Sequence, residues 1–386
     1  MRLISLSATG YRSLQSIRLD IRQLAVFVGE NGVGKSNLYR AMQMIKAAAE
    51  GTLSYEIARE GGMQSALWTG KRKPGPVRMI FSASFDDDEE AIRTGHAVRT
   101  GFAPSYSIEI GLRPPVAAGF AFEPQIKEES LTIDSGRRPV EMMDRKGPAV
   151  FARDDSGRRI EHPVRLLDSE TALAALGNAG RYPEIGDLRA TILGWRFYHG
   201  FRTDRDSPVR QPALAITAPM LDEDGRNLAA VFATLVHIRG DTVDLDHCIA
   251  SALGGAVLDV PVPRETATFG LQMPEFPQRI FRPEELSDGQ IRFLALAGAL
   301  LSYRLPRLIA LNEPETSLHP SMLPALAEMI ANAAERTQVW IVTHSRILAD
   351  EIEARTGARA LTVVRDHGAT TIKGVRVSGS YSDDDD

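Results

Sequence analysis

The residues GENGVGKS at positions 29–36 decide the fold, because they satisfy the pattern G-x4-G-K-[ST] of a phosphate-binding loop. In such a loop, small residues let backbone N–H groups surround phosphate oxygens, Lys35 reaches the outer phosphates and the hydroxyl of Ser36 binds Mg²⁺. The apolar run LAVFV precedes the loop and a helical pattern follows it. This context favours a strand, a loop and a helix over a chance glycine-rich turn, and the helix dipole strengthens the anion site.

The helix after the loop is predicted by the spacing of its apolar residues. Several of them recur at helical intervals and so share one face, and Gly51 is placed to end the helix. These apolar residues are Leu38, Ala41, Met42, Ile45 and Ala48. We expect the helix to pack on a sheet.

The rest of the chain divides by its sequence pattern. Short alternating runs separated by Gly, Pro and Asp predict antiparallel hairpins from about 77 to 166. Residues 183–258 are mostly helical in pattern, without sustained apolar heptads. Beyond residue 284, helices and strands alternate, which indicates a parallel sheet. We expect helices at 288–302, 321–335 and 346–355, strands at 307–311 and 338–342, and a hairpin over 360–377.

The composition is that of an ordinary folded protein. The 386 residues allow two or three domains, 43% of them are hydrophobic, and the formal charge of -5 argues against an overall basic coat for nucleic acid. Cys248 is the single cysteine and forms no internal disulfide, and no apolar stretch is long enough to span a bilayer. We therefore expect a cytoplasmic protein without membrane contact.

Polar residues follow two of the predicted buried strands. Asn312 and Glu313 end the run LIALNE, and His344 follows the run QVWIVT. Open parallel sheets present such residues to a ligand at the carboxyl edge of the sheet, where Glu313 could act as a general base on water. For each motif in isolation, an ordinary strand boundary or a structural histidine is the alternative.

The residues LSDGQ at 286–290 open the predicted helix at residue 288. Ser287 and Gln290 fit a capping box, which by itself explains the motif. A capped helix start with a serine hydroxyl and Gly289 is also a second phosphate-binding surface. The residues alone leave both interpretations open.

Read together and in this order, four motifs resemble those of ABC-type ATPases. The match is specific because all four share one order along the chain. The N-terminal residues ISLSATGYRSLQSIRLDIRQLAVFV resemble the soluble RecF, SMC and OLD-like branch, including its small "predicted AAA-type ATPase" members. The motifs are GENGVGKS as Walker A, LSDGQ as signature, LIALNEPETSLHP as Walker B with D-loop, and IVTHS as switch histidine.

The resemblance implies an α/β P-loop ATPase head with a mixed or parallel central sheet, an antiparallel β lobe and a helical insert. It implies ATP and Mg²⁺ as ligands, and a homodimer that closes head-to-tail around two ATP molecules. Glu313 would deprotonate the attacking water and His344 would sense the γ-phosphate. Ser36 and Asn312 would hold Mg²⁺, and residues 317–319 would couple the two sites. The other nucleotide contacts would be Asn31, Gly32, Gly34, Lys35, Ser36, Asn37 and Arg12 from one copy, and Ser287, Gly289 and Gln290 from the other.

The domains expected from the resemblance are discontinuous. Residues 1–60 and 275–386 would form the ATPase core. Residues 61–180 would form an antiparallel β-rich lobe, and residues 181–274 a mainly helical subdomain on the signature side.

The sequence departs from the family pattern at two motif positions. Asn312 stands where the family usually has Asp, and because an amide holds a Mg²⁺-bound water less strongly than a carboxylate, slow turnover is one expectation. Asp288 stands where Gly is common, in a first helical turn that favours acidic side chains. The glutamine of the Q-loop is not identified, and Gln125 and Gln211 fit it only by order.

Three related classes fit the sequence less well. The long separation between Ser36 and Ser287 disfavours an ABC transporter subunit, and the missing heptads disfavour an SMC coiled coil. The short segment after His344 has no room for a Toprim nuclease, and the aspartates at 383–386 have no scaffold to fix them round a metal. The leading interpretation is an ATP-hydrolysing dimeric head that regulates DNA-linked work in repair or anti-phage defence. The alternative is a slowly hydrolysing, nucleotide-gated scaffold that controls a separate effector, a nuclease or a toxin.

Direct DNA binding rests on analogy with the family. Basic residues cluster at 71–73, 137–138, 158–159 and 202–210, but a solvated loop is the preferred explanation for each cluster.

Overall fold

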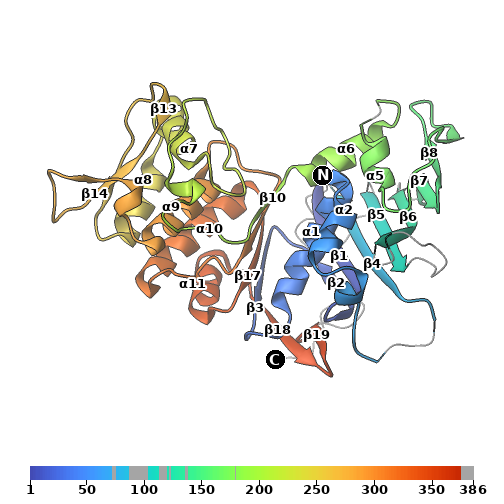
Figure 1. Cartoon of the computed structure of the whole chain (residues 1–386). Helices are drawn as coiled ribbons and strands as arrows, with labels where there is room; N and C mark the ends of the chain where they lie inside the picture. The colour runs from blue at the N-terminus through green and yellow to red at the C-terminus, as the bar shows by residue number, and fades with distance from the viewer. Residues whose placement is uncertain are drawn as a thin grey trace. The chain divides into compact units, whose positions relative to one another are not determined.

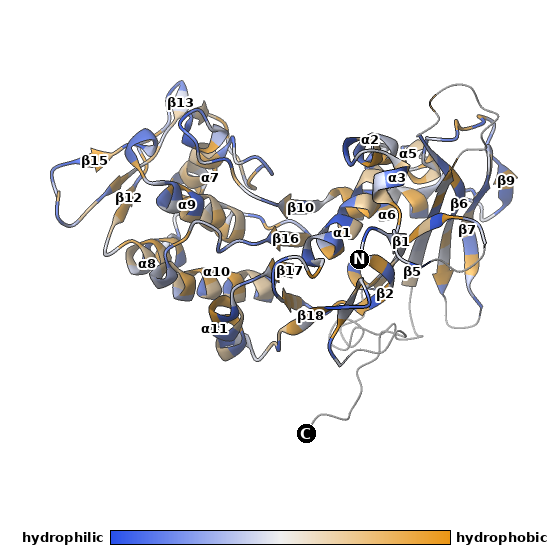
Figure 2. Cartoon of the chain, turned by 60° about the horizontal axis from the view of Figure 1, so that its bottom comes forward, coloured by the Kyte–Doolittle hydropathy of each residue, from blue (hydrophilic) through white to orange (hydrophobic). Residues whose placement is uncertain are grey.

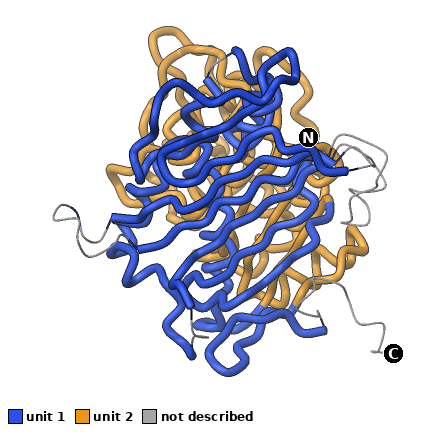
Figure 3. The backbone as a smooth tube through the Cα atoms, turned by 90° about the vertical axis from the view of Figure 1, so that its right-hand side faces the viewer, with its two compact units in different colours: residues 1–22, 29–195, 362–386 blue, residues 23–28, 196–361 orange. Residues whose placement is uncertain are grey.

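The computed structural model describes residues 1–71, 75–86, 103–112, 120, 123–134, 138–178 and 180–374. The chain forms two compact units (Figure 3). Unit 1 consists of residues 1–22, 29–195 and 362–386, and unit 2 of residues 23–28 and 196–361. Neither unit is a continuous segment. The predicted domain boundaries group the residues differently and stay a prediction.

Unit 1 contains an eight-stranded antiparallel sheet in the order β2-β1-β4-β5-β6-β7-β8-β9. Buried and less buried residues alternate along β4 and β6, as expected of a sheet with one covered face. The hairpins predicted between 77 and 166 are confirmed, and the first two strands of the chain join the same sheet. The strands are β1 (Arg2–Tyr11), β2 (Leu14–Asp20), β4 (Arg78–Asp86), β5 (Ala103–Leu112), β6 (Pro124–Asp134), β7 (Val140–Lys146), β8 (Ala149–Arg153) and β9 (Arg159–Glu161).

The helix α1 (Lys35–Glu50) contacts β1 and β4 of this sheet, as predicted (Figure 1). It ends at Gly51, which has φ 84° and donates its N–H to the carbonyl of Ala47. Two side chains satisfy further carbonyls at this end, since Thr171 donates to Ala48 O at 2.7 Å and Arg189 to Ala49 O at 2.8 Å. The other elements among the described residues of unit 1 are α2 (Leu53–Arg59), α3 (Met63–Ala66), α5 (Ala172–Leu176), α6 (Pro183–Leu193) and the hairpin of β18 (Leu361–Asp366) with β19 (Ala369–Ile372).

Unit 2 is built round a parallel sheet. β16 (Leu308–Asn312) pairs with β17 (Gln338–Thr343), which pairs with β3 (Leu24–Val28), and β10 (Trp195–Tyr198) lies beyond β16. Every residue of β16 and β17 is buried, as in sheets covered on both faces. The alternation of helix and strand predicted beyond residue 284 is confirmed.

The core of unit 2 centres on α9 (Asp288–Leu301), whose residues 291–301 are all buried. Complete burial of a side chain such as Phe293 or Leu294 stabilises the fold by about 1.5–3 kcal/mol. α10 (Leu323–Arg336) packs beside α9 and is amphipathic, with both hydrophobic and hydrophilic residues along it (Figure 2). The other helices of unit 2 are η1 (Pro208–Arg210), α7 (Leu228–Thr234), the π-helix η2 (Leu235–Arg239), α8 (Val243–Ala252), η3 (Pro283–Glu285), η4 (Pro320–Met322) and α11 (Arg346–Thr356).

The stretch 183–258, predicted to be mostly helical, holds α6, α7, η2 and α8, but strands interrupt it. These strands are β10, β11 (Ala213–Leu214) and the start of β12 (Val257–Asp259). β11 pairs with β13 (Thr266–Ala267), and β12, β14 (Gly270–Gln272) and β15 (Ile280–Phe281) form a small antiparallel sheet.

The described residues contain no coiled coil, and their longest helix is α1 with 16 residues. Nor does any helix within the described ranges have the length and apolar character of a membrane span. Parts of two predicted basic clusters, residues 72–73 and Arg137, lie outside the described residues, as does the aspartate tail.

Candidate functional site

The glycine-rich loop begins directly after Val28, the last residue of β3. Gly32 and Gly34 have φ values of 83° and 98°, a left-handed conformation that glycine adopts without steric cost. A Cβ on Gly34 would lie 1.9 Å from Thr370 Oγ1 and 2.4 Å from Ser13 Oγ. Both the backbone conformation and the close packing at position 34 therefore require glycine.

Side chains from both ends of the chain hold this loop within unit 1. Ser13 Oγ and Thr370 Oγ1 lie 2.6 Å apart, and Thr370 Oγ1 donates to Val33 O at 2.8 Å. Asn37, which was expected to contact nucleotide, donates its amide to Ser13 Oγ at 2.7 Å. We call Ser13, Asn37 and Thr370 the loop brace. It fixes the loop to the first and last hairpins of the chain.

The first turn of α1 can receive an anion. No side chain caps this helix start, and a helix start directs backbone N–H groups toward an anion. The N–H of Asn37 donates to Gly34 O. Lys35 is 4% exposed and donates to Gly29 O and Glu30 O, each at 2.7 Å. Ser36 is half-buried beside it, while Asn31 and Gly32 are exposed. The loop thus places a cation beside the N–H groups of a helix start.

The side chain of Arg12 is held by a carboxylate, that of Glu60. The φ of Arg12 is 46°, and its Nε donates to Glu60 Oε2 at 2.9 Å. Arg40 lies 3.6 Å from the other oxygen of the same carboxylate. The predicted contact of Arg12 with nucleotide stays a prediction.

In unit 2, three parallel strands end along one edge. The register places Asn312 opposite Val342 and Thr343 opposite Val28. Because parallel strands present their carboxyl ends on the same side, Glu313 after β16 shares this edge with the residue after β17. The glycine-rich loop continues from the third strand of the set.

Glu313 has a constrained backbone. Its φ of 49° is rare for a residue with a side chain and stores about 1–3 kcal/mol of strain. Its N–H donates to Val342 O at 2.7 Å, and its carbonyl accepts from Arg292 at 3.1 Å. Its Oε2 lies 3.9 Å from Nδ1 of His344, and both side chains are partly exposed. The structure thus brings the predicted general base and the predicted sensor together.

Asn312 is buried at the end of β16. Its Nδ2 and Nδ1 of His199 lie 2.8 Å apart, which fits donation from the amide to an imidazole nitrogen. Its Oδ1 is buried and has no partner among the described residues. A buried oxygen left without a donor costs about 1–3 kcal/mol, so Oδ1 is an open acceptor for a water or a ligand.

The signature residues form the predicted capping box. Ser287 Oγ accepts from the N–H of Gln290 at 3.3 Å, and Gln290 Oε1 accepts from the N–H of Ser287 at 2.8 Å. Buried Arg210 donates to Asp288 Oδ1 at 2.9 Å and to two carbonyls of the same loop. A Cβ on Gly289 would lie 2.8 Å from the carbonyl oxygen of Ser317, so this position needs glycine.

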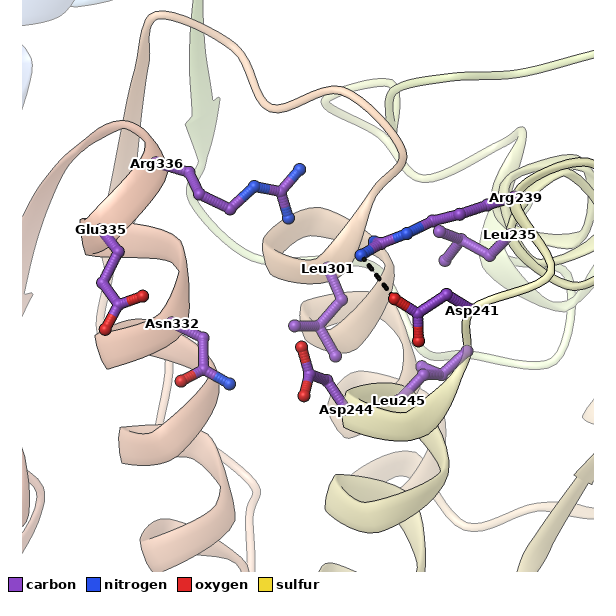
Figure 4. Close-up of a pocket in the computed structure, with 9 residues that line it drawn as sticks. All are labelled: Leu235, Arg239, Asp241, Asp244, Leu245, Leu301, Asn332, Glu335 and Arg336. Atoms are coloured by element: carbon purple, nitrogen blue, oxygen red, sulfur yellow. Dashed lines mark hydrogen bonds and ion pairs between the residues drawn. The ribbon is translucent and has the colours of Figure 1, made fainter.

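Two glutamines and one cavity are not assigned to the site formed by these motifs. Gln125 lies on β6 and Gln211 follows η1, and neither is identified as the Q-loop residue. A cavity of about 290 Å³ in unit 2 contains none of the predicted site residues (Figure 4). Arg239 and Arg336 line it, opposed by three carboxylates, and burial together with the nearby Arg239 lowers the pKa of Arg336. These charges nearly balance, so the cavity indicates no particular ligand.

Solved structures of SMC heads have a similar architecture. The chain matches the crystal structure of an SmcHead bound to the C-winged helix domain of ScpA with a TM-score of 0.56 and 14% identity, covering 96% of this chain and 97% of that one. It also matches an Smc head domain with an extended coiled coil, bound to the C-terminal domain of ScpA derived from Pyrococcus furiosus, with a TM-score of 0.51 and 12% identity over 96% and 95% of the two chains. The chain has the fold of an SMC head. The predicted resemblance to ABC-type P-loop ATPases of the RecF and SMC-like branch is confirmed at the level of the fold.

A family model gives an independent match over part of this SMC-head fold. Residues 264–350 match the model described as "AAA domain, putative AbiEii toxin, Type IV TA system". This range contains the signature, Walker B and switch residues. No curated protein sequence matches the chain.

Sequence reasoning missed several residues that shape these motifs. Glu315 stands two positions after Glu313 inside a quoted motif, a signal that could have found it. His199 and Thr370 give no local signal, since their partners lie 113 and 337 positions away. Arg210 was noted only as one member of a basic cluster.

Proposed function

We propose that the chain is an ATPase that binds ATP with Mg²⁺ and pairs head-to-tail with a second copy around the nucleotide. Its task would be to regulate DNA-linked work, in repair or in anti-phage defence. One observation carries the proposal: the parallel register of β16, β17 and β3. It aligns the carboxyl ends of these three strands. Asn312 ends β16 and Glu313 follows it, His344 follows β17, and the glycine-rich loop follows β3.

The chain's own residues supply each role that hydrolysis requires. Lys35 and the N–H groups of α1 bind phosphate oxygens. The carboxylate of Glu313 takes a proton from the attacking water, and the imidazole of His344 contacts the γ-phosphate. Ser287 of the second copy contributes its hydroxyl and the start of its α9 to the same phosphate.

The donors present fit Mg²⁺. This ion prefers oxygen ligands and keeps several of its waters, and the buried, partnerless Oδ1 of Asn312 is a suitable acceptor for one of them. The hydroxyl of Ser36 is the direct ligand that the loop pattern implies. When bound, Mg²⁺ neutralises the charge that develops on the phosphates.

The proposal is tested by ATP binding and turnover of the purified chain and its Glu313→Gln variant. We expect the variant to bind ATP as the wild type does and to lose turnover by about a hundredfold or more, because the general base is gone. Glu275→Gln, an exposed residue outside the motifs, is the matched control and should behave as wild type. A chain that neither binds ATP nor loses turnover on Glu313→Gln would refute the proposal.

Asn312 favours a second candidate, a slowly hydrolysing scaffold that holds or controls an effector protein. An amide can donate to the unprotonated Nδ1 of His199, which a carboxylate cannot do, so the pair suits asparagine. Robust wild-type turnover would count against the scaffold, whereas activation by Asn312→Asp from a very low level would support it.

DNA contact is a separate part of the proposal. Filter binding with a salt titration tests it, because phosphate contacts release counterions and give log affinity a negative slope against log salt. A slope near zero would remove direct DNA binding, and the regulation would then act through a protein partner.

A further inference from the structure

Glu315 is a buried carboxylate beside the proposed catalytic edge, and none of the roles assigned above belongs to it. Its side chain is 5% exposed. Its Oε1 accepts from Thr343 Oγ1 at 2.6 Å and from the N–H groups of His344 and Ser345 at 2.9 and 3.2 Å. We call residues 343–345, which connect β17 to α11, the switch turn. One oxygen of Glu315 therefore binds all three residues of the switch turn.

The same oxygen also meets the imidazole of His344. Nδ1 of the ring lies 3.0 Å from Glu315 Oε1, closer than the 3.9 Å to Glu313 Oε2. An ionised carboxylate can only accept, so a ring nitrogen this close to it favours the proton on Nδ1. A neutral imidazole carries one proton, and with Nδ1 occupied, Nε2 is the unprotonated nitrogen. The side chain of His344 is 41% exposed, so the rest of the ring can reach a ligand.

The fold provides a positive charge for this carboxylate. Burial lowers the pKa of Arg292, and Glu315 is the first of the charges that oppose this shift. Arg292 Nε and Glu315 Oε2 are both buried without a hydrogen-bond partner in the described residues. Burial of a carboxylate costs free energy unless it is paired and hydrogen-bonded, and only one of the two oxygens of Glu315 binds the switch turn.

Stabilisation of the turn alone does not account for Glu315. The start of α11 already has its own cap, because Ser345 Oγ accepts from the N–H of Leu348 at 3.1 Å. The N–H of Ser345 also lies 2.9 Å from Thr343 Oγ1, a second acceptor within the turn. What Glu315 adds is an acceptor for the histidine ring and a negative charge.

We propose that Glu315 is the positioning residue of His344, which holds the switch turn and fixes the proton of the imidazole on Nδ1. The consequence of this positioning for hydrolysis rests on the proposed function. The effect of Glu315 on the imidazole of His344 is independent of that function and can be measured without ATP.

The first test is the tautomer of His344, read from long-range ¹⁵N–¹H NMR of the full chain with labelled histidine. His344→Gln assigns the signal, and spectra are compared where the ring is neutral. Wild type should carry the proton on Nδ1, whereas Glu315→Ala should shift the ring toward the Nε2 form. A wild-type ring protonated on Nε2, or a ring that Glu315→Ala leaves unchanged, overturns the proposal.

The second test separates kcat from KM for ATP. Because a misplaced group lowers the rate of the chemical step, Glu315→Ala should reduce kcat by about a hundredfold with KM within about twofold. Glu315→Gln keeps the acceptor without the charge and should lose about tenfold. Glu351→Gln, a surface residue of α11, is the control and should behave as wild type.

The outcomes distinguish the two hypotheses. Wild-type turnover that neither Glu315 variant changes would overturn the positioning role. A wild type without turnover would count against the proposed function, and the NMR result alone would then decide for or against Glu315. If the alanine variant fails to fold, the wild-type tautomer and the kcat of the isosteric Glu315→Gln decide, and a wild-type ring protonated on Nε2 or a wild-type kcat in Glu315→Gln overturns the proposal.

Discussion

Replacement of Asn312 by aspartate should lower the concentration of Mg²⁺ needed for turnover. The buried Oδ1 of Asn312 is an open acceptor, and the 2.8 Å contact of Nδ2 with Nδ1 of His199 sets the orientation of the amide. In Asn312→Asp, His199 can keep its contact by moving its proton to Nδ1. The new carboxylate then faces a metal-bound water with the same geometry.

The magnitude follows from hydrogen-bond strengths. A neutral hydrogen bond contributes about 0.5–1.5 kcal/mol and one to a charged group about 1.5–3 kcal/mol. The difference of about 1.4 kcal/mol corresponds to a tenfold change in affinity. Half-saturation of ATP turnover by Mg²⁺ should therefore fall about tenfold in Asn312→Asp.

The assay is steady-state phosphate release over a Mg²⁺ titration at saturating ATP. Asn332→Asp on α10 adds the same charge away from the motifs and is the control. An unchanged or higher Mg²⁺ requirement in Asn312→Asp, with an unaffected control, would show that Asn312 does not hold the metal's water.

Three further predictions concern stability and reactivity. Gly34→Ala should lower the free energy of unfolding by about 2–3 kcal/mol in urea titrations, because it strains the left-handed backbone and displaces the Thr370 hydroxyl. Thr370→Ala in the same chain should remove the part of this loss that comes from the hydroxyl. A loss under about 0.5 kcal/mol would contradict the close packing. Glu129→Ala should cost about 3–5 kcal/mol because it leaves a buried arginine unpaired, while exposed Glu128→Ala on the same strand should change stability little. Burial raises the pKa of Cys248 to about 12, so a thiol reagent at pH 8 should react only after unfolding, and stoichiometric labelling of the folded chain would contradict its buried position.

The elements that the sequence predicts well are those whose determinants are local. The helix after the glycine-rich loop, the strands at 308–312 and 338–343, and the capping box of Ser287 with Gln290 all follow from residues a few positions apart. Hydrophobic spacing and capping act over one or two turns, so a reading of neighbouring residues is sufficient.

The elements that it predicts poorly depend on distant partners. Ser13 and Thr370 meet across 357 positions. His199 reaches Asn312 only because β10 lies beside β16 in the sheet. The pairing of β1 with β4 likewise depends on residues far apart in the sequence, because the alternating pattern of each strand does not specify its partner. Supporting residues from distant segments, such as His199 and Thr370, therefore cannot be predicted from neighbouring residues, whereas Glu315 lies within a quoted motif and could have been.

The central claim is that each ATP site combines Lys35 of one copy with Ser287 of another. The most direct measurement mixes two variants, Lys35→Ala and Ser287→Arg, each expected to be inactive alone. In an equal mixture of symmetric dimers, half are mixed and each of these has one intact site, so turnover should recover to about one quarter of wild type. A mixture as inactive as its components, with both variants folded and wild type active, would contradict the claim.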